Sequence, residues 1–228
     1  MGSDQVRIAY SERAVEYATL LGHVEDLALQ DRGHLEGWAA RVDGPILDLG
    51  CGPGHWTAHL VDRGHEVRGI DPVPAFVEIA RDRRPDIDVR LGGARDLLDV
   101  PGPDGGYGGI LAWYSLIHLD PAALPGALAR IRGALRPCGR LLLGLFDGGD
   151  APGPEPFEHA VVTAHRWPVS VVVALLRAAG LEPVDVVRRT DPGSRPHLAI
   201  EAVAGPGGEG ASPRSMPAHG GSGPTLSR

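Results

Sequence analysis

One nine-residue segment limits the possible folds of this chain more than any other. Residues 46–54 read Ile-Leu-Asp-Leu-Gly-Cys-Gly-Pro-Gly, an apolar run followed by three alternating glycines. The run predicts a buried strand, and residues 55–63 behind it have helical spacing. Glycines at such a turn let the backbone approach a ligand closely, and a helix N-terminus offers free N–H groups. We therefore expect an α/β fold with a ligand site at this turn.

The rest of the chain alternates between extended and helical patterns. The predicted strands are 45–49, 66–70, 87–91, 109–114, 140–146, 184–189 and 198–203. The predicted helices are 3–21, 23–41, 55–63, 74–83, 121–135 and 168–179. Such alternation indicates βαβ units and a mostly parallel sheet, and the continuous apolar strands indicate helices on both faces. The link between the last two strands is too short for a crossover helix, so the final strand should be antiparallel.

Three segments differ in their expected roles. Residues 1–41 read as an N-terminal helical lid and residues 42–204 as the ligand-binding domain, within the range of a single α/β domain. Residues 205–228 contain Gly or Pro at eleven of 24 positions and show no apolar period. Such a segment cannot bury enough surface to offset its ordering entropy. We therefore expect a disordered tail that is dispensable for activity.

Composition excludes several classes of protein. The formal net charge is −7 and no basic stripe is present, which argues against a nucleic-acid partner. No apolar segment has the length of a membrane span or the character of a signal peptide, so we expect a soluble, cytoplasmic monomer or homodimer. Cys51 and Cys138 lie far apart and outside any CxxC pair. This spacing argues against a zinc site and a disulfide scaffold.

Two acids accompany the glycine turn. A dinucleotide-binding fingerprint would require a third glycine at His55 or Thr57, so a nicotinamide-dependent reductase is disfavoured. Asp48, just upstream of the turn, would repel a pyrophosphate but would favour a cationic amino group or a sulfonium. Asp71 ends the second predicted strand, where a carboxylate can bind a ribose diol.

Several further stretches occur in a family-specific order. They are AYSERAVEY, ILDLGCGPGHWTAHL, GIDPVPAFVEIAR, GGILAWYSLIHLDP, LRPCGRLLLGLF and AHRWPVSVVVALLRAAG. Together they resemble the class I S-adenosylmethionine-dependent methyltransferases, and especially small actinobacterial proteins of the methyltransferase-11/25 type, over residues 5–204. The resemblance implies a Rossmann-like fold with a seven-stranded, mostly parallel sheet. It also implies S-adenosylmethionine as cofactor and S-adenosylhomocysteine as product.

The same resemblance implies a reaction, an in-line transfer of a methyl group to an O or N atom of a small-molecule acceptor. C- or S-methylation, and a non-catalytic S-adenosylmethionine-binding protein, are the alternatives. The implied loop under the methionine and ribose consists of Gly50, Cys51, Gly52 and Gly54. Cys51 itself reads as a small packed residue rather than a nucleophile.

The resemblance assigns further cofactor contacts. Asp48 would lie near the methionine amino group, Asp71 would bind both ribose hydroxyls, and Pro72 would pack beside the adenine. Relatives often carry Gly-Asp-Ala after the third strand, where this chain has Gly92, Gly93 and Ala94. Adenine recognition would then depend on the backbone of Ala94 and Arg95, or on Asp96. The residues expected to face the methionine and sulfonium are Ala112 and Trp113.

Candidate catalytic residues surround this site. His118 could deprotonate an acceptor at neutral pH, or it could be a hydrogen-bonded residue ahead of a helix capped by Asp120. Tyr10 and Tyr17 lie seven residues apart on one helical face. They could pack in the core, or they could contact the cofactor from the lid, with Tyr17 close to the reacting methyl.

A second cluster precedes the last predicted helix. In the resembled family this insertion builds the acceptor pocket, and the substrate candidates in it are His159, His165 and Trp167, with His165 also a catalytic candidate. Tyr114 and His118, after the fourth predicted strand, are the other substrate candidates. Arg166 and Trp167 could instead only anchor the helix that starts at Pro168. A metal site made of the three histidines 118, 159 and 165 is disfavoured, because their spacing matches no common ligand pattern.

Overall fold

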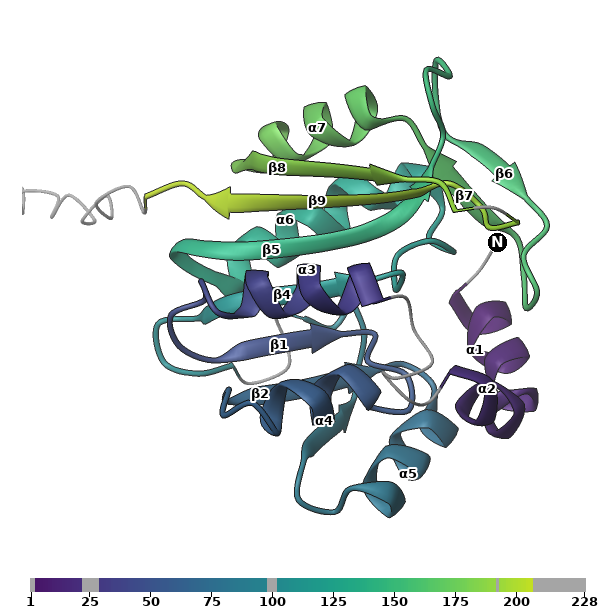
Figure 1. Ribbon diagram of the computed structural model, residues 1–228, viewed down its shortest axis with the longest axis vertical. Coiled ribbons are helices and arrows are strands. Elements are labelled where there is room, and N and C mark those ends of the chain that lie inside the picture. The colour runs from purple at the N-terminus through teal and green to yellow at the C-terminus, as the bar shows by residue number, and fades with distance from the viewer. Residues whose placement is uncertain (1–2, 22–28, 98–101, 192, 207–228) are drawn as a thin grey trace, which may run out of the picture.

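The computed structural model describes residues 3–21, 29–97, 102–191 and 193–206, and Figure 1 shows its elements. The strands are β1 (Ile46–Leu49), β2 (Val67–Asp71), β3 (Asp88–Leu91), β4 (Tyr107–Trp113), β5 (Leu135–Asp147), β6 (Glu155–Phe157), β7 (Ala164–Trp167), β8 (Leu181–Arg189) and β9 (His197–Ala204). The helices are α1 (Ser3–Glu12), α2 (Ala14–Leu21), α3 (Leu29–Ala39), α4 (His55–Val61), α5 (Pro74–Arg83), α6 (Leu124–Ala134) and α7 (Val169–Ala178).

All the described strands belong to one nine-stranded sheet. Its order is β3-β2-β1-β4-β5-β7-β6, with β9 also paired to β5 and β8 paired to β9. The pairs among β1 to β5 are parallel, whereas β9 runs antiparallel to both β5 and β8. This confirms the predicted mostly parallel sheet with an antiparallel last strand. Two strands, β6 and β7, were not predicted. They form an antiparallel hairpin, and β7 pairs in parallel with the last residues of β5.

Helices cover both faces of the sheet centre. One face packs against α3 and α4, through a cluster that includes Leu35, Trp38, Ile46, Trp56, Leu60, Leu111 and Leu142. The other face packs against α6 and α7, through a larger cluster that includes Leu47, Ile110, Leu128, Ile131, Leu143, Val172 and Leu176. The central strands β1, β4 and β5 alternate their side chains between these clusters, so both faces of the sheet centre are apolar, as continuous apolar strands require.

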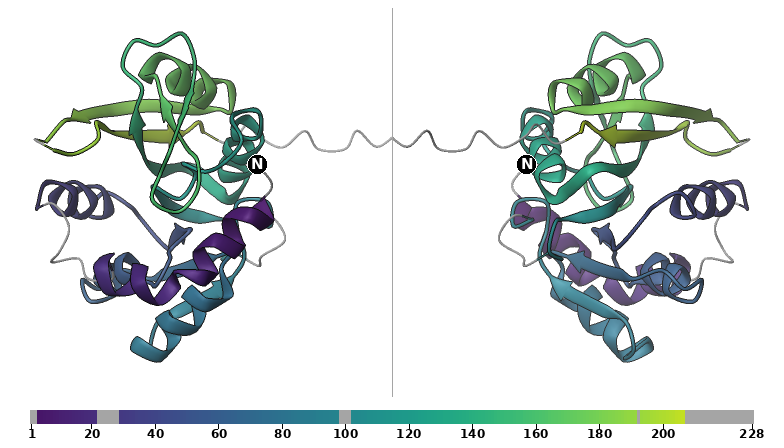
Figure 2. Two further views of the ribbon diagram at one scale, coloured as in Figure 1. Left: turned by 90° about the vertical axis from the view of Figure 1, so that its right-hand side faces the viewer. Right: turned by 90° about the vertical axis from the view of Figure 1, so that its left-hand side faces the viewer.

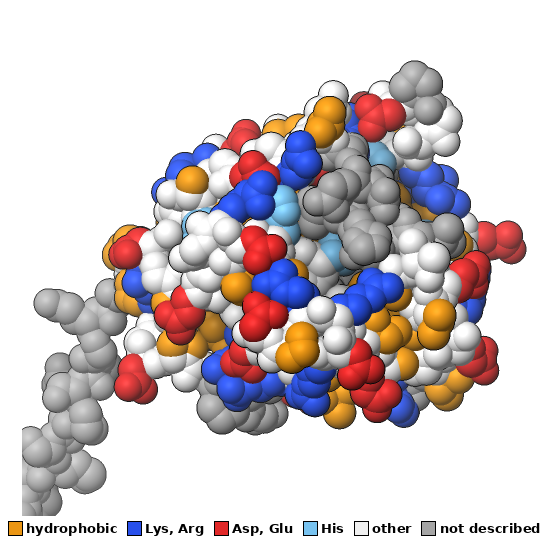
Figure 3. Space-filling view, turned by 60° about the horizontal axis from the view of Figure 1, so that its bottom comes forward, with side chains coloured by type: hydrophobic (Ala, Val, Ile, Leu, Met, Phe, Trp, Pro, Cys, Tyr) orange, Lys and Arg blue, Asp and Glu red, His pale blue; other side chains and the backbone are white. Residues whose placement is uncertain are grey.

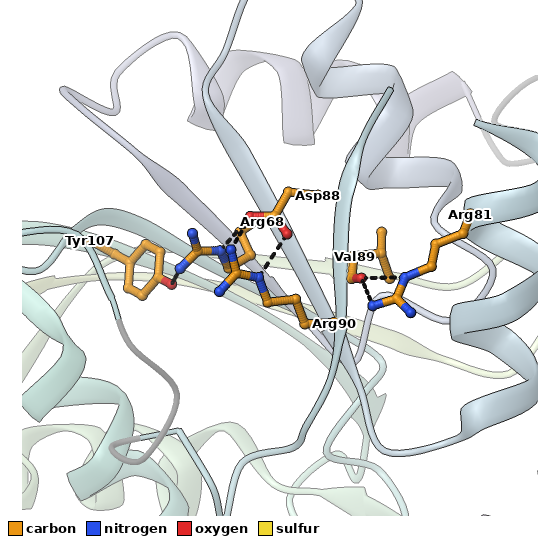
Figure 4. A network of polar contacts seen from close by, with 6 residues as sticks. All are labelled: Arg68, Arg81, Asp88, Val89, Arg90 and Tyr107. Atoms are coloured by element: carbon orange, nitrogen blue, oxygen red, sulfur yellow. Dashed lines mark hydrogen bonds and ion pairs between the residues drawn. The ribbon is translucent and has the colours of Figure 1, made fainter. Parts of the chain in front are cut away.

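Toward the β3 edge, the face that carries α6 and α7 holds charges. Arg68 Nε and Arg90 Nε each donate to the Asp88 carboxylate at 2.8 Å, and Arg68 also reaches the Tyr107 hydroxyl at 3.4 Å (Figure 4). The Asp88 side chain is 41% exposed. In the described part of the chain between β3 and β4 there is no helix. The Arg68, Asp88 and Arg90 side chains therefore occupy this face near β3 in place of a helix. The expectation of helices on both faces is confirmed only for the centre of the sheet.

Several predicted boundaries were wrong. The helix predicted over residues 3–21 is two helices separated at Arg13. Another helix was predicted over residues 23–41. Its first residues lie outside the described part, which omits 22–28, and the described remainder is α3. The helix predicted from Pro121 begins as a 3-10 turn, Pro121–Ala123, in which the Asp120 carboxylate accepts from the Ala122 N–H at 2.9 Å.

Most of the tail, residues 207–228, also lies outside the described part. No helix that is described could cross a membrane.

Candidate functional site

The glycine turn sits between β1 and α4 at the carboxyl edge of the sheet. Gly50, Gly52 and Gly54 have φ angles of +74°, +55° and +79°, in the left-handed region that favours glycine. A Cβ on Gly50 would lie 2.3 Å from Ser115 Cβ, whereas a Cβ on Gly52 would meet nothing within 4 Å. Gly50 therefore lets the turn pack against the loop after β4, and Gly52 leaves open space above the turn.

Asp71 lies beside this turn at the end of β2. Its Oδ2 accepts from the Gly52 N–H and its Oδ1 from the Val73 N–H, both at 2.8 Å. Burial raises its pKa to about 6, against the lowering effect of these two hydrogen bonds. A carboxylate has about four lone-pair positions. Each oxygen therefore keeps capacity for one further donor, as two neighbouring hydroxyls would require.

Asp48 and Cys51 lie behind the turn. Asp48 is 2% exposed and accepts from the Thr57 hydroxyl at 2.7 Å. Burial first, and the charge of Asp71 to a lesser degree, raise its pKa to about 7. Cys51 packs among Val77, Ala80, Ile87 and Val89. Asp48 thus bonds to α4 through Oδ2, and Cys51 packs in the core. The expected place of Asp48 near a ligand amino group stays a prediction.

A cavity of about 660 Å³ opens in front of the turn. Its walls come from α1, the turn, the ends of β2 and β3, and the loop after β4. The lining residues are Val6, Arg7, Leu49, Gly50, Pro72, Pro74, Leu91–Asp96, Ser115, Leu116, His118, Leu119 and Asp120. The predicted residues Gly50, Pro72, Ala94, Arg95 and His118 are among them. Sequence reasoning missed the α1 residues and Ser115, although Ser115 could have been suspected because it follows a strand end directly.

Helices α1 and α2 lie across the carboxyl edge of the sheet (Figure 2). Tyr10 and Tyr17 pack on Phe76 of α5, with ring centroids 5.8 and 5.3 Å from the Phe76 ring. The Arg83 guanidinium donates to the Ala18 carbonyl at 3.2 Å and so ties α2 to α5. Both tyrosines therefore pack on α5, as one of the two alternatives expects, and their contact with a cofactor stays a prediction. Burial, and the nearby charge of Asp71, raise the pKa of both phenols.

His118 connects the lid to the loop after β4. Its Nδ1 lies 2.9 Å from the Thr163 carbonyl, which can only accept, so Nδ1 carries the hydrogen. Its Nε2 lies 2.8 Å from the Tyr10 hydroxyl. Burial lowers the pKa of His118, which keeps the ring neutral at pH 7. A neutral ring with hydrogen on Nδ1 has its lone pair on Nε2, and Tyr10 donates to it.

The β6–β7 hairpin brings further histidines close to His118. The His159 ring lies 5.1 Å from that of His118, and burial followed by the charge of His118 lowers the His159 pKa to about 4. His165 donates its backbone N–H to the Ile117 carbonyl at 2.9 Å. Trp167 is 1% exposed and belongs to the core under α7. Trp167 therefore anchors the end of the hairpin just before α7, as the alternative raised from the sequence expects, and its contact with substrate stays a prediction.

Residues at the end of β4 differ in their surroundings. Ala112 is fully buried in the core, and Trp113 and Tyr114 line a different cavity of about 300 Å³ between α3 and the β8–β9 hairpin. Tyr114 has a φ of +55°, so the chain turns sharply there and Ser115 faces the first cavity. Trp113 is the last residue of β4, and side-chain alternation places it on the same face as Leu111, toward α3. Its expected contact with the methionine stays a prediction.

Comparisons with known proteins agree with this geometry. Residues 46–139 match the family model described as a methyltransferase domain. An uncharacterized methyltransferase of Mycobacterium tuberculosis is 35% identical over 96 residues, which is 42% of this chain and 37% of that protein. The trans-aconitate 2-methyltransferase of Mycolicibacterium gilvum is 32% identical over 151 residues, 65% of this chain and 54% of that protein. The chain thus spans about a third to a half of these relatives.

Solved structures share the fold over nearly the whole chain. The 1,6-didemethyltoxoflavin-N1-methyltransferase of Burkholderia thailandensis has a TM-score of 0.64 and 22% identity, with 90% of this chain and 91% of that chain covered. A [4+2]-cyclase has a TM-score of 0.70 and 19% identity, with 90% and 98% covered. The second likeness shows that this fold alone does not determine a reaction. Residues 46–139 thus match a methyltransferase domain, and the chain shares the fold of solved structures that include a methyltransferase.

Proposed function

We propose that the chain binds S-adenosylmethionine in the first cavity and transfers its methyl group to an O or N atom of a small molecule by in-line displacement. One observation carries the proposal. A single cavity joins the glycine turn, the ends of β2 and β3, and a neutral histidine bonded to the lid. Its volume lies within the usual range for small-molecule sites, about 300–1,000 Å³.

The residues around the cavity suit the parts of this cofactor. Asp71 would bind the ribose diol with the lone pairs that Gly52 and Val73 leave free. Gly92–Asp96 and Pro72 would hold the adenine, and the open space over Gly52 would admit the chain between ribose and methionine. When bound, the cofactor supplies a methyl group activated by a sulfonium. The protein then has mainly to position the acceptor.

On the acceptor side, we assign His118 and Tyr10 as a pair that takes up the acceptor proton. An acceptor hydroxyl or amine beside Tyr10 would lose its proton to the phenol oxygen as Tyr10 passes its own proton to His118 Nε2. The Thr163 carbonyl would stabilise the resulting imidazolium through Nδ1–H. Tyr17 would orient Tyr10, because their rings meet edge to face at 5.7 Å. His165 would hold the Ile117 segment through its backbone.

The surface charge supports a small acceptor. On the face shown in Figure 3, basic side chains are interspersed with acidic ones and form no single-sign patch. The net charge of −7 also disfavours a polyanionic acceptor. A monomer or homodimer that acts on small molecules remains our expectation.

Methyl transfer can be tested with methyl-labelled S-adenosylmethionine and a panel of phenols, amines and carboxylates. We expect label in a product of at least one class, and loss of that product in Asp71→Ala. Binding of S-adenosylhomocysteine without label transfer to any class would contradict the enzyme assignment. It would favour a non-catalytic binding protein or another reaction on the same fold.

A further inference from the structure

The cavity of about 300 Å³ beside the end of β4 is a second built site. It lies between α3 and the β8–β9 hairpin, and its walls carry four ring side chains. The lining residues are Gln30, Asp31, His34, Trp113, Tyr114, Val187, Arg188, Arg189, His197, Leu198 and Ala199. Tyr114 lines this cavity, and the next residue, Ser115, lines the first. The two cavities therefore meet at one turn of the chain.

Backbone features fix the rings in this cavity. The Trp113 ring packs directly on the backbone of Gly144 in β5. This contact requires glycine, because a Cβ on Gly144 would lie 2.7 Å from Trp113 Cε3. Tyr114 adopts a left-handed conformation, which costs free energy for a non-glycine residue and is found where a site holds it in place. Its N–H donates to the Gly144 carbonyl at 3.1 Å, and its hydroxyl bonds to His197 Nδ1.

Two rings form one side of this cavity. The His34 and Trp113 ring centroids lie 6.5 Å apart, with 33° between their planes, as for two rings in direct contact. A flat ligand would therefore pack against this pair of rings. His34 Nε2 is buried and has no hydrogen-bond partner among the described residues. A buried polar atom of this kind calls for a partner.

The charges at the wall favour a neutral ligand. Arg189 is bonded to Asp31 at 2.8 Å and pairs with Asp191 at 2.8 Å, and Arg188 donates to Asp147 at 2.7 Å. Each cation thus already has a carboxylate partner. With the Tyr114 phenol donating to Nδ1, neutral His197 carries its hydrogen on Nε2. That N–H can donate to a ligand oxygen.

We propose that this cavity holds the planar ring of a neutral aromatic or heteroaromatic molecule that bears a hydroxyl or carbonyl oxygen, packed against the Trp113 and His34 rings. This site is separate from the acceptor position beside Tyr10, so the inference goes beyond the proposed function. The ring would lie beside the cofactor cavity, on the other side of the Tyr114–Ser115 turn.

Three compounds with one carbon skeleton test the ligand class by calorimetry. They are 2-naphthol, which is planar and neutral, decahydro-2-naphthol, which is saturated, and 2-naphthoate, which is anionic. We expect 2-naphthol to bind most tightly. Equal or tighter binding of the saturated alcohol would contradict stacking, tighter binding of the carboxylate would show an anion site, and absence of 2-naphthol binding would overturn the proposal.

Substitutions in the wall of the second cavity test whether 2-naphthol binds there. Trp113→Ala and His34→Ala should each weaken 2-naphthol binding about threefold to tenfold, because each removes one ring that the ligand contacts. Gly144→Ala should weaken it also, by displacing the Trp113 ring. Val184→Ala is the matched control, since it alters an exposed residue of the same hairpin. Unchanged 2-naphthol affinity in both Trp113→Ala and His34→Ala would overturn the assignment.

Binding of S-adenosylhomocysteine by the same variants separates this inference from the proposed function. Retained binding in Trp113→Ala and His34→Ala would show that both variants fold. If the wild-type chain binds 2-naphthol in this cavity but no S-adenosylhomocysteine, the second site stands and the proposed function fails. If it binds S-adenosylhomocysteine but no 2-naphthol, the proposed function stands and this inference fails.

Discussion

Two buried carboxylates, Asp48 and Asp71, lie on opposite sides of the glycine turn and differ in what they contact. Asp71 bonds to backbone N–H groups and keeps lone pairs available, whereas Asp48 bonds to a side chain of α4. Burial raises the pKa of both acids, and Asp48 reaches about 7. This difference is consistent with the proposed ligand binding by Asp71, and it gives Asp48 a pH signature.

Asp48 should make the stability of the folded chain depend on pH. Its folded pKa of about 7 exceeds the ordinary value of 3.8, so the folded state binds this proton more tightly than the unfolded state. Its contribution to the free energy of unfolding is then largest at low pH and is lost as pH rises through about 7. The free energy of unfolding of the wild-type chain, relative to that of Asp48→Asn, should fall by more than about 1 kcal/mol from pH 5 to pH 8.

Chemical denaturation of both chains at pH 5, 6, 7 and 8 measures this difference. Most other titrating groups are common to the two chains, so their contributions largely cancel. A difference that stays constant across this range would show that Asp48 is ionised throughout. Asp82→Asn, which changes an exposed carboxylate of α5, is the control for the removal of one carboxylate.

Gly50 and Gly52 offer a matched comparison at the turn. Both have positive φ, so alanine at either position costs roughly 1–2 kcal/mol of backbone strain. Only Gly50 also faces a clash, at 2.3 Å from Ser115 Cβ. Gly50→Ala should therefore lower the free energy of unfolding by about 1–3 kcal/mol more than Gly52→Ala does. Equal losses in denaturant titrations would mean that the turn and the Ser115 loop do not touch.

The sequence predicted some features of the site and not others, for identifiable reasons. Asp71 could be predicted because a strand end fixes its position at the edge of the sheet. The second cavity beside Trp113 could not, because α3 and the β8–β9 hairpin that complete it are far from Trp113 in sequence. The bond from the Thr57 hydroxyl to Asp48 could not be predicted either, because it depends on how α4 packs on β1. Such features depend on tertiary contacts, which no local pattern contains.

At the level of elements, the lid is held by few contacts. Tyr10 of α1 bonds to His118, and Arg13, between α1 and α2, bonds to the Ala160 carbonyl of the β6–β7 hairpin. Elements with few buried contacts open most readily. Opening of α1 would expose the first cavity, because Val6 and Arg7 form one of its walls.

Tyr10→Phe should loosen the lid while leaving its packing on Phe76 intact. The loss of one hydrogen bond is worth about 1 kcal/mol, so S-adenosylhomocysteine should dissociate up to roughly fivefold faster. Stopped-flow displacement measures this rate. Val15→Ala, a change at an exposed residue of α2, should leave the rate unchanged. An unchanged rate in Tyr10→Phe would show that α1 does not limit ligand release.

Element boundaries show where sequence patterns lose information. The core strands were predicted well because apolar runs must be buried on both faces. The β6–β7 hairpin was not predicted, since its three- and four-residue strands are too short to show a period. The break between α1 and α2 at Arg13 was missed because the apolar spacing continues across it.

For the whole molecule, the described fold ends with β9 and two further residues. The expectation that residues 207–228 are dispensable follows from their composition alone. A chain ending at residue 206 should keep the thermal unfolding midpoint and the S-adenosylhomocysteine affinity of the full chain. A loss of affinity greater than about threefold, or roughly 0.65 kcal/mol, would assign the tail a role in ligand binding.

Calorimetric titration of the full chain with S-adenosylhomocysteine tests the central claim most directly. We expect binding at one site per chain, weakened at least about tenfold in Asp71→Asn, because the amide cannot accept from the two backbone N–H groups and the ribose hydroxyls together. Asp82→Asn is the control for the change in charge. Absence of binding, or equal affinity in the wild-type chain and Asp71→Asn, would contradict the assignment of the first cavity to the cofactor.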